Sequence, residues 1–212
     1  MIKVSVIIPA YQTVIYIERC LRSLEEQTIS FEHFEIIVII DGPDKLLHEI
    51  VTNKFPRVII ITHEKNLGLP SALNTGLRSA KGRYVVRVDS DDYVESCYLD
   101  FLIYAIESNS YYDAVACDYI EVDNQERQIK RSNALEEPIG CAIIFSRQAL
   151  LEIGLYNTEF TLREEEELMK RFLAAGYKKM HLPLPMYRYR KHSENITNNS
   201  EEMAFFKDKL SN

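Results

Sequence analysis

The chain has 212 residues, of which 46% are hydrophobic and 27% are charged, and this length and composition suit one globular domain with a full core. Its net charge of −7 argues against a nucleic-acid partner, because binding to a phosphate backbone depends on a basic stripe. The four cysteines include no Cys-x-x-Cys pair, so we expect reduced thiols, a cytoplasmic location and neither a zinc nor a redox centre.

No apolar segment approaches the length of a membrane span, and the opening one is too short for a signal peptide. We therefore expect a soluble protein without a transmembrane segment. A location at the inner face of a membrane stays open, because a peripheral enzyme needs no spanning helix.

The first third of the chain alternates apolar, β-branched runs with amphipathic ones. The expected order is strand 3–8, helix 14–27, strand 35–40, a helix capped by Asp44 that runs to about Lys54, and strand 57–62. The first strand is expected to stop at Pro9, which has no amide hydrogen. This alternation predicts an α/β fold with a mostly parallel central sheet and helices on both faces.

A loop at residues 66–68 leads into a predicted helix at 71–80. Pro70 and Ser71 suit a helix start, and a helix amino terminus after a glycine loop favours a phosphate or a ribose hydroxyl. An ordinary capped helix explains the same residues equally well.

Residues 83–94 contain a short valine-rich strand that ends in three carboxylates. If the extended backbone continues through Ser90, then Arg87, Asp89 and Asp91 face one side and Ser90 faces the other. Converging carboxylates suit a hard divalent cation such as Mg²⁺ or Mn²⁺, and Arg87 can bind phosphate or orient an aspartate. A simple turn at the end of the strand is the alternative.

The second half is expected to mix strands and helices in less regular order. We predict helix 95–108, strand 112–122, a turn at 123–126 into a short polar strand, a polar and mobile segment at 129–138, strand 140–145, helix 147–153 and a last strand at 178–182. A polar tail follows at 194–212 and contains a short amphipathic piece at 203–210.

Four glutamates occupy the first turn of a further predicted helix. Glu166 and Glu167 stand four residues before Lys170 and Arg171, so we expect exposed ion pairs. The remaining two, at 164 and 165, align with the buried side of the helix. Negative charge at the start of a helix is stabilising in itself, and the functional alternative is a general base at the rim of a pocket.

A basic segment follows the last predicted strand, and alternation puts Arg188, Arg190 and His192 on one side of it. His192 can ligate a metal or contact a diphosphate, although a lone histidine is more often structural.

Taken together, these features resemble the family 2 glycosyltransferases, which are inverting enzymes of the GT-A fold. The resemblance covers nearly the whole chain. It rests on these motifs in the family's order: residues 4–11, residues 39–42, Asn66-Leu67-Gly68, residues 87–92, the acid pair before Leu168 and residues 189–192. It implies a single Rossmann-like GT-A domain at 1–193, with a nucleotide-binding half at 1–94 and an acceptor-side half at 95–193.

The resemblance also implies a role for each matching residue. The nucleotide-sugar site would comprise Pro9, Ala10, Tyr11, Asp41, Asn66, Gly68, Arg87, Asp89, Ser90 and Arg190. The metal site, for Mn²⁺ or Mg²⁺, would comprise Asp91, Asp89 and His192. The catalytic base would be Glu165 or Glu164. The family usually has Glu-Asp where this chain has Glu-Glu, so the base carries one extra methylene and the choice between the two stays open.

The implied reaction moves a sugar from a nucleotide-diphosphate sugar, with UDP favoured, to a hydroxyl of a saccharide or lipid-linked acceptor. Bacterial surface polysaccharide or glycolipid synthesis is the expected setting. A non-catalytic sugar-nucleotide binding module is the main alternative. A haloacid-dehalogenase-like phosphatase would carry its Asp-x-Asp on the opening strand, and a nucleotidyltransferase would have a glycine-rich loop in place of residues 9–12.

Overall fold

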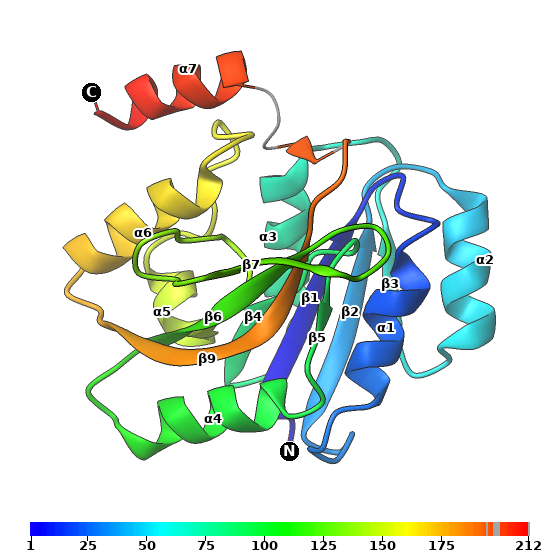
Figure 1. Ribbon diagram of the computed structural model, residues 1–212, viewed down its shortest axis with the longest axis horizontal. Coiled ribbons are helices and arrows are strands. Elements are labelled where there is room, and N and C mark those ends of the chain that lie inside the picture. Colours follow the sequence, from blue (N-terminus) through cyan, green and yellow to red (C-terminus); the bar gives the residue numbers. More distant parts are fainter. Residues whose placement is uncertain (194, 197–199, 212) are drawn as a thin grey trace.

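One mixed β-sheet forms the centre of the molecule, with helices against both of its faces (Figure 1). The structure is a computed structural model that describes residues 1–193, 195–196 and 200–211. Its strands are β1 (Val4–Ala10), β2 (Phe34–Ile40), β3 (Ile59–Thr62), β4 (Tyr84–Arg87), β5 (Tyr93–Val94), β6 (Ala114–Val122), β7 (Gln128–Ser132), β8 (Ile143–Ser146) and β9 (Lys179–Arg190). Its helices are α1 (Ile17–Glu25), α2 (Lys45–Lys54), α3 (Leu69–Ser79), α4 (Tyr98–Ser108), α5 (Arg147–Glu152), α6 (Glu164–Ala174) and α7 (Ser200–Ser211).

The sheet is parallel where it begins and mixed farther on. Its order is β3-β2-β1-β4-β8-β6-β9-β5, with β7 paired to β6 outside this path. β1 runs parallel to β2 and β4, and β2 runs parallel to β3. β8 is antiparallel to both β4 and β6, whereas β9 is parallel to β6. The carboxyl ends of β1, β2 and β4 therefore meet at one edge, where ligands collect in such sheets.

Each face of the sheet has its own hydrophobic core, because successive side chains of a strand point to opposite faces. Along β1, Val6 and Ile8 join the core under α1, α2 and α4, while Ile7 joins the core under α3, α5 and α6. Gly76 lets α3 lie close to the sheet, since a Cβ there would be 2.5 Å from Cγ2 of Ile7. The predicted α/β fold with helices on both faces is confirmed.

Most predicted elements lie within about three residues of those observed, and Asp44 caps α2 by accepting a hydrogen bond from Leu47 N at 2.9 Å. The stop at Pro9 is wrong, because β1 continues to Ala10. The backbone N–H and C=O groups of odd-numbered residues in β1 point toward β4, as the hydrogen bond from Val88 N to Ile7 O shows. β4 pairs with β1 only as far as Ile7, so no β4 residue lies opposite Pro9. The missing amide hydrogen of Pro9 therefore costs no ladder bond.

The short polar strand predicted after the turn at 123–126 is β7, which pairs antiparallel with β6. It extends to Ser132, so the mobile segment expected at 129–138 is wrong over these residues. Four of the five β7 side chains are exposed, so no apolar alternation indicates where the strand ends. The last strand is also longer than expected, because β9 passes through Pro183 and Pro185 where its register with β6 shifts.

The C-terminal helix α7 contains the predicted amphipathic piece and packs Phe206 against Phe160 and Leu162. Residues 194, 197–199 and 212 of the predicted tail lie outside the described residues. Among the helices that the structure describes, none combines the length and the apolar character that a bilayer crossing requires.

Candidate active site

The acidic segment after β4 turns instead of running straight. β4 ends at Arg87, and Asp92 N donates to Asp89 O at 3.1 Å across a turn at Ser90 and Asp91. The extended backbone expected through Ser90 is therefore wrong, because the strand loses its ladder partners before that point. As a result, the Asp89 and Asp91 carboxylates have different neighbours.

Two of the three predicted metal ligands, Asp91 and His192, lie against each other. Its Oδ2 is 2.9 Å from Nε2 of His192, and the imidazole stacks on the ring of Tyr16 with centroids 4.9 Å apart. Burial, and then the charge of Asp89, raises the pKa of Asp91, while the hydrogen bond with His192 opposes this. A carboxylate oxygen and an imidazole nitrogen at this separation suit one divalent ion, whose neighbouring ligands lie about 3 Å apart when each is about 2.1 Å from the metal.

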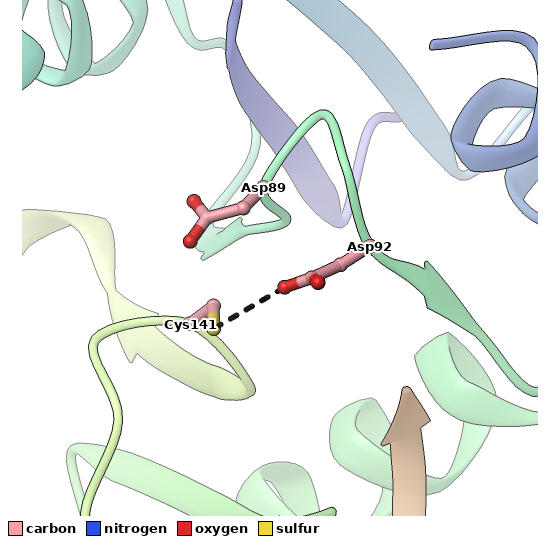
Figure 2. A group of neighbouring side chains, drawn as sticks. All are labelled: Asp89, Asp92 and Cys141. Carbon is pink, nitrogen blue, oxygen red and sulfur yellow. Dashed lines mark hydrogen bonds between the residues drawn. The ribbon is translucent and has the colours of Figure 1, made fainter. Parts of the chain in front are cut away.

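Asp89 instead approaches Asp92 and Cys141, with ligand atoms within 4.8 Å of one another. Figure 2 shows the Asp92 carboxylate directed at the Cys141 thiol. Both Asp92 oxygens already accept hydrogen bonds, from Tyr187 Oη and from Arg190 N, each at 2.7 Å. Burial also raises the pKa of Cys141, which disfavours the thiolate that a metal needs. Asp92 and Cys141 are therefore buried supports of the segment, and neither was predicted as a site residue.

Arg87 joins the acidic segment to the glutamate helix. Its Nε and Nη2 donate to the two oxygens of Asp89 at 2.6 and 3.0 Å, and its Nη1 donates to Glu164 at 2.8 Å. Gly140 lies directly against this bridge, because a Cβ there would be 2.7 Å from Nη1 of Arg87 and 3.0 Å from Cβ of Glu165. Arg87 and both glutamates were predicted as site residues, whereas Gly140 was not.

The two candidate bases differ in what holds them. Glu164 is 3% exposed and is tied to Arg87, whereas no ion pair to Glu165 occurs within the described part of the chain. Burial, followed by repulsion from Glu164, raises the pKa of Glu165 to about 8. Glu165 is thus the carboxyl group that is able to exchange a proton near neutral pH.

The other two glutamates of α6 form ion pairs. Glu167 pairs with Arg171 at 2.6 Å, as the spacing predicts, but this pair is partly buried instead of exposed, and Arg171 also donates to the carbonyls of Ile153 and Leu155. Glu166 pairs with Arg163 at 2.9 Å instead of Lys170. Lys170 donates to the carbonyl of Leu210 in α7 instead.

Asp41, at the end of β2, holds the loop at 66–68. Its two oxygens accept from the backbone amides of Leu67 and Gly68, each at 2.8 Å. His63 lies 2.7 Å from Asp41 and 2.9 Å from Oγ1 of Thr75 in α3. His63 follows β3 at the same sheet edge, and that position was the signal by which the sequence could have identified it.

The remaining predicted donor-site residues differ in exposure. Tyr11, which follows β1, is 51% exposed, and Asn66 is also exposed, whereas Pro9 and Gly68 are partly buried. The buried members are Ala10, Ser90 and Arg190. Arg190 Nε donates to the carbonyl of Asp91 at 2.8 Å, so its guanidinium lies beneath the acidic turn.

A family model described as Glycosyl transferase family 2 matches residues 5–175. Among curated proteins, the chain is 36% identical over 143 residues to the uncharacterized glycosyltransferase EpsJ of Bacillus subtilis (strain 168). That match covers 64% of this chain and 40% of the relative, so the chain spans less than half of the relative's length.

Solved structures show the same fold. TarS 1-349 of S. aureus in complex with UDP-GlcNAc matches with a TM-score of 0.78 and 22% identity, over 94% of this chain and 61% of that one. The mannosyltransferase PcManGT from Pyrobaculum calidifontis in complex with GDP-Man and Mn²⁺ matches with a TM-score of 0.76 and 17% identity, over 99% of this chain and 64% of that one. These likenesses confirm the GT-A fold that the resemblance implies.

Proposed function

The chain belongs to glycosyl transferase family 2, and we propose that it is an inverting, metal-dependent glycosyltransferase acting on a nucleotide-diphosphate sugar. The observation that carries the proposal is the arrangement at one sheet edge. Asp91 and His192 lie together after β4 and near the end of β9. The bridge from Asp89 through Arg87 reaches Glu164 on α6, next to Glu165, for which the described residues supply no ion pair.

Asp41 supports a uracil nucleotide as the donor's base. A carboxylate has about four lone-pair positions, and three of those of Asp41 are occupied by Leu67 N, Gly68 N and His63. The remaining position on Oδ2 can accept one N–H, such as the imide of uracil. The UDP-GlcNAc bound by TarS is consistent with a UDP-sugar donor.

Asp91 and His192 would hold the divalent ion, for which Mn²⁺ or Mg²⁺ is expected. When bound, the ion would neutralise charge on the departing nucleoside diphosphate. The Mn²⁺ in the PcManGT complex supports this choice of site chemistry. Arg190 supports this pair through its hydrogen bond to the carbonyl of Asp91, and the Tyr16 ring supports it by stacking on His192.

Glu165 acts as the general base in this proposal. Its carboxylate removes the proton from the acceptor hydroxyl while that oxygen attacks the anomeric carbon on the face opposite the diphosphate. The bond from the anomeric carbon to the diphosphate oxygen breaks in the same step, so the configuration inverts. Glu164 is already tied to Arg87, which leaves Glu165 for this role.

The setting of the reaction stays a proposal. We expect a saccharide or lipid-linked acceptor, a role in bacterial surface polysaccharide or glycolipid synthesis, and a cytoplasmic location at or near the membrane. We also propose that residues 1–94 bind the nucleotide and residues 95–193 face the acceptor. The family match argues against the phosphatase alternative. Turnover of a sugar nucleotide would distinguish an enzyme from a non-catalytic binding module.

One assay separates these possibilities. The chain is incubated with UDP-, GDP- and dTDP-sugars with and without Mn²⁺, and both release of nucleotide and thermal shift are recorded. We expect Mn²⁺-dependent binding and slow donor hydrolysis or transfer with a UDP-sugar, and loss of turnover with retained binding in E165Q. Binding without turnover in the unaltered chain would instead indicate the non-catalytic module, and neither binding nor turnover would overturn the proposal.

A further inference from the structure

We propose that Arg87 is a positioning residue that links the donor site to the catalytic base. Its guanidinium holds Asp89 on one side and Glu164 on the other, and through Glu164 it fixes the first turn of α6, where Glu165 lies. This inference rests on the proposed function and assigns a role that goes beyond it.

The bridge is buried and geometrically complete. Side-chain exposure is 11% for Arg87, 20% for Asp89 and 4% for Glu164. A planar guanidinium presents a rigid fork, and its two-point contact with Asp89 fixes the orientation of that carboxylate. Nη1 points away from this contact to Glu164, so one cation sets the positions of two acids that are 75 residues apart in the chain.

The surroundings make the bridge stiff. Two carboxylates in a buried setting need a cation between them, because an uncompensated buried charge is strongly destabilising. The backbone at Gly140 leaves room for the guanidinium and for Glu165 but for nothing larger, since even a Cβ would be 2.7 Å from Arg87. Gly140 therefore bounds the guanidinium on one side, and the hydrogen bonds to Asp89 and Glu164 orient it.

The two arms of the bridge predict separate effects. The arm to Asp89 ends in the proposed nucleotide site, so it governs how well the donor binds. The arm to Glu164 ends on α6, so it governs how Glu165 meets the acceptor hydroxyl. A displacement of about 1 Å at such a group is enough to lower turnover by roughly 10²-fold.

The test compares E164Q, R87Q and R87K with the matched control R171Q. Arg171 also grips a carboxylate of α6, because its Nε and Nη2 donate to Glu167 at 2.7 and 2.6 Å, but it does so away from the site. UDP affinity with Mn²⁺ is measured by calorimetry. Turnover of a UDP-sugar is read on the alkaline plateau of each variant's pH profile, so that a changed pKa of Glu165 does not enter.

We expect E164Q to lower kcat about 10- to 100-fold and to leave UDP affinity within about twofold. R87Q should lower both quantities, R87K should recover part of each, and R171Q should change neither. If R87Q does not fold, E164Q and R87K decide the question alone. Unchanged kcat in E164Q, or loss of UDP affinity in E164Q as large as in the Arg87 variants, overturns the inference while the proposed function stands. A wild-type chain that neither binds UDP nor turns over a donor overturns both.

Discussion

The carboxylate of Asp91 and the imidazole of His192 meet at 2.9 Å, although 101 residues separate them in the chain. Asp91 lies in the turn after β4, and His192 lies just past the end of β9. The two residues come together because β9 pairs with β5, which follows the acidic turn, in the register that sets Tyr93 opposite Arg188. The cation site that we propose is thus built by strand pairing, from residues that no local motif connects.

We predict that D91N abolishes Mn²⁺-dependent stabilisation without unfolding the protein. Loss of a ligand should cost at least the roughly 10- to 100-fold in metal affinity that loss of an outer-shell partner costs. Because burial and Asp89 raise the pKa of Asp91, its charge is unfavourable in the fold, so the neutral side chain should not lower Tm. Thermal unfolding with increasing Mn²⁺ measures both effects. A D91N protein that binds Mn²⁺ as wild type does would rule out Asp91 as a ligand.

Turnover should rise with pH until Glu165 has lost its proton. Because its pKa is raised to about 8, kcat is expected to fall about tenfold per pH unit below that value and to level off above it. Repulsion from Glu164 contributes to the shift, so E164Q should move this limb to lower pH. A kcat profile with the same acid limb in wild type and E164Q would contradict the assignment.

The ionisation of Glu165 should also affect the stability of the fold. The pKa of Glu165 is raised from 4.5 in the unfolded reference to about 8, so between these values the folded state holds a proton that the unfolded state has released. The free energy of unfolding therefore decreases as pH rises from about 4.5 to about 8, and this contribution is constant above that range. E165Q cannot titrate, so its urea-unfolding free energy should exceed that of wild type increasingly across this window. Parallel curves for the two proteins would show that Glu165 is not buried with a raised pKa.

The proposed donor side of the site could be predicted from sequence because its residues lie where strands end. Asp41 follows β2 and Asp89 follows β4, and parallel strands bring such positions to one edge. The proposed acceptor side was harder to predict from sequence. Helical periodicity turns Glu164 and Glu165 alike toward the interior, and only the bond from Arg87 to Glu164 tells them apart.

What the sequence could not supply depends on strands that are inserted out of chain order. Cys141 and Gly140 reach the site because β8 lies between β4 and β6, and no local pattern encodes that placement. The straight backbone assumed through Ser90 failed for the same reason, since the end of β4 is set by its neighbours in the sheet.

His63 should govern donor affinity, although no motif marks it. It links Asp41 to Thr75 of α3, so H63A should loosen the 66–68 loop while leaving Glu165 untouched. We expect KM for the donor to rise roughly tenfold, the effect of losing one to two hydrogen bonds, with kcat changed by less than about twofold. Steady-state kinetics measure this split, with H48A on the exposed face of α2 as the control. A fall in kcat at constant KM would place His63 elsewhere in the mechanism.

Gly140 and Gly176 should respond to alanine in opposite ways. Gly140 has ordinary backbone geometry but no space, because a Cβ would be 2.7 Å from Nη1 of Arg87 and 3.0 Å from Cβ of Glu165. G140A should therefore displace both side chains and lower kcat by about 10- to 100-fold. Gly176 has open space around it but a left-handed φ of +88°, so G176A should cost about 1 to 2 kcal/mol of stability and leave kcat intact.

Kinetics and urea unfolding on both variants separate crowding at the base from backbone strain. If G140A were as active as wild type, the close approach of the Gly140 backbone to the bridge would have no part in catalysis. If G176A lost activity as G140A does, general destabilisation would explain both results. The expected crossed pattern, in which one variant loses turnover and the other loses stability, ties the catalytic geometry to the space that Gly140 leaves beside Arg87 and Glu165.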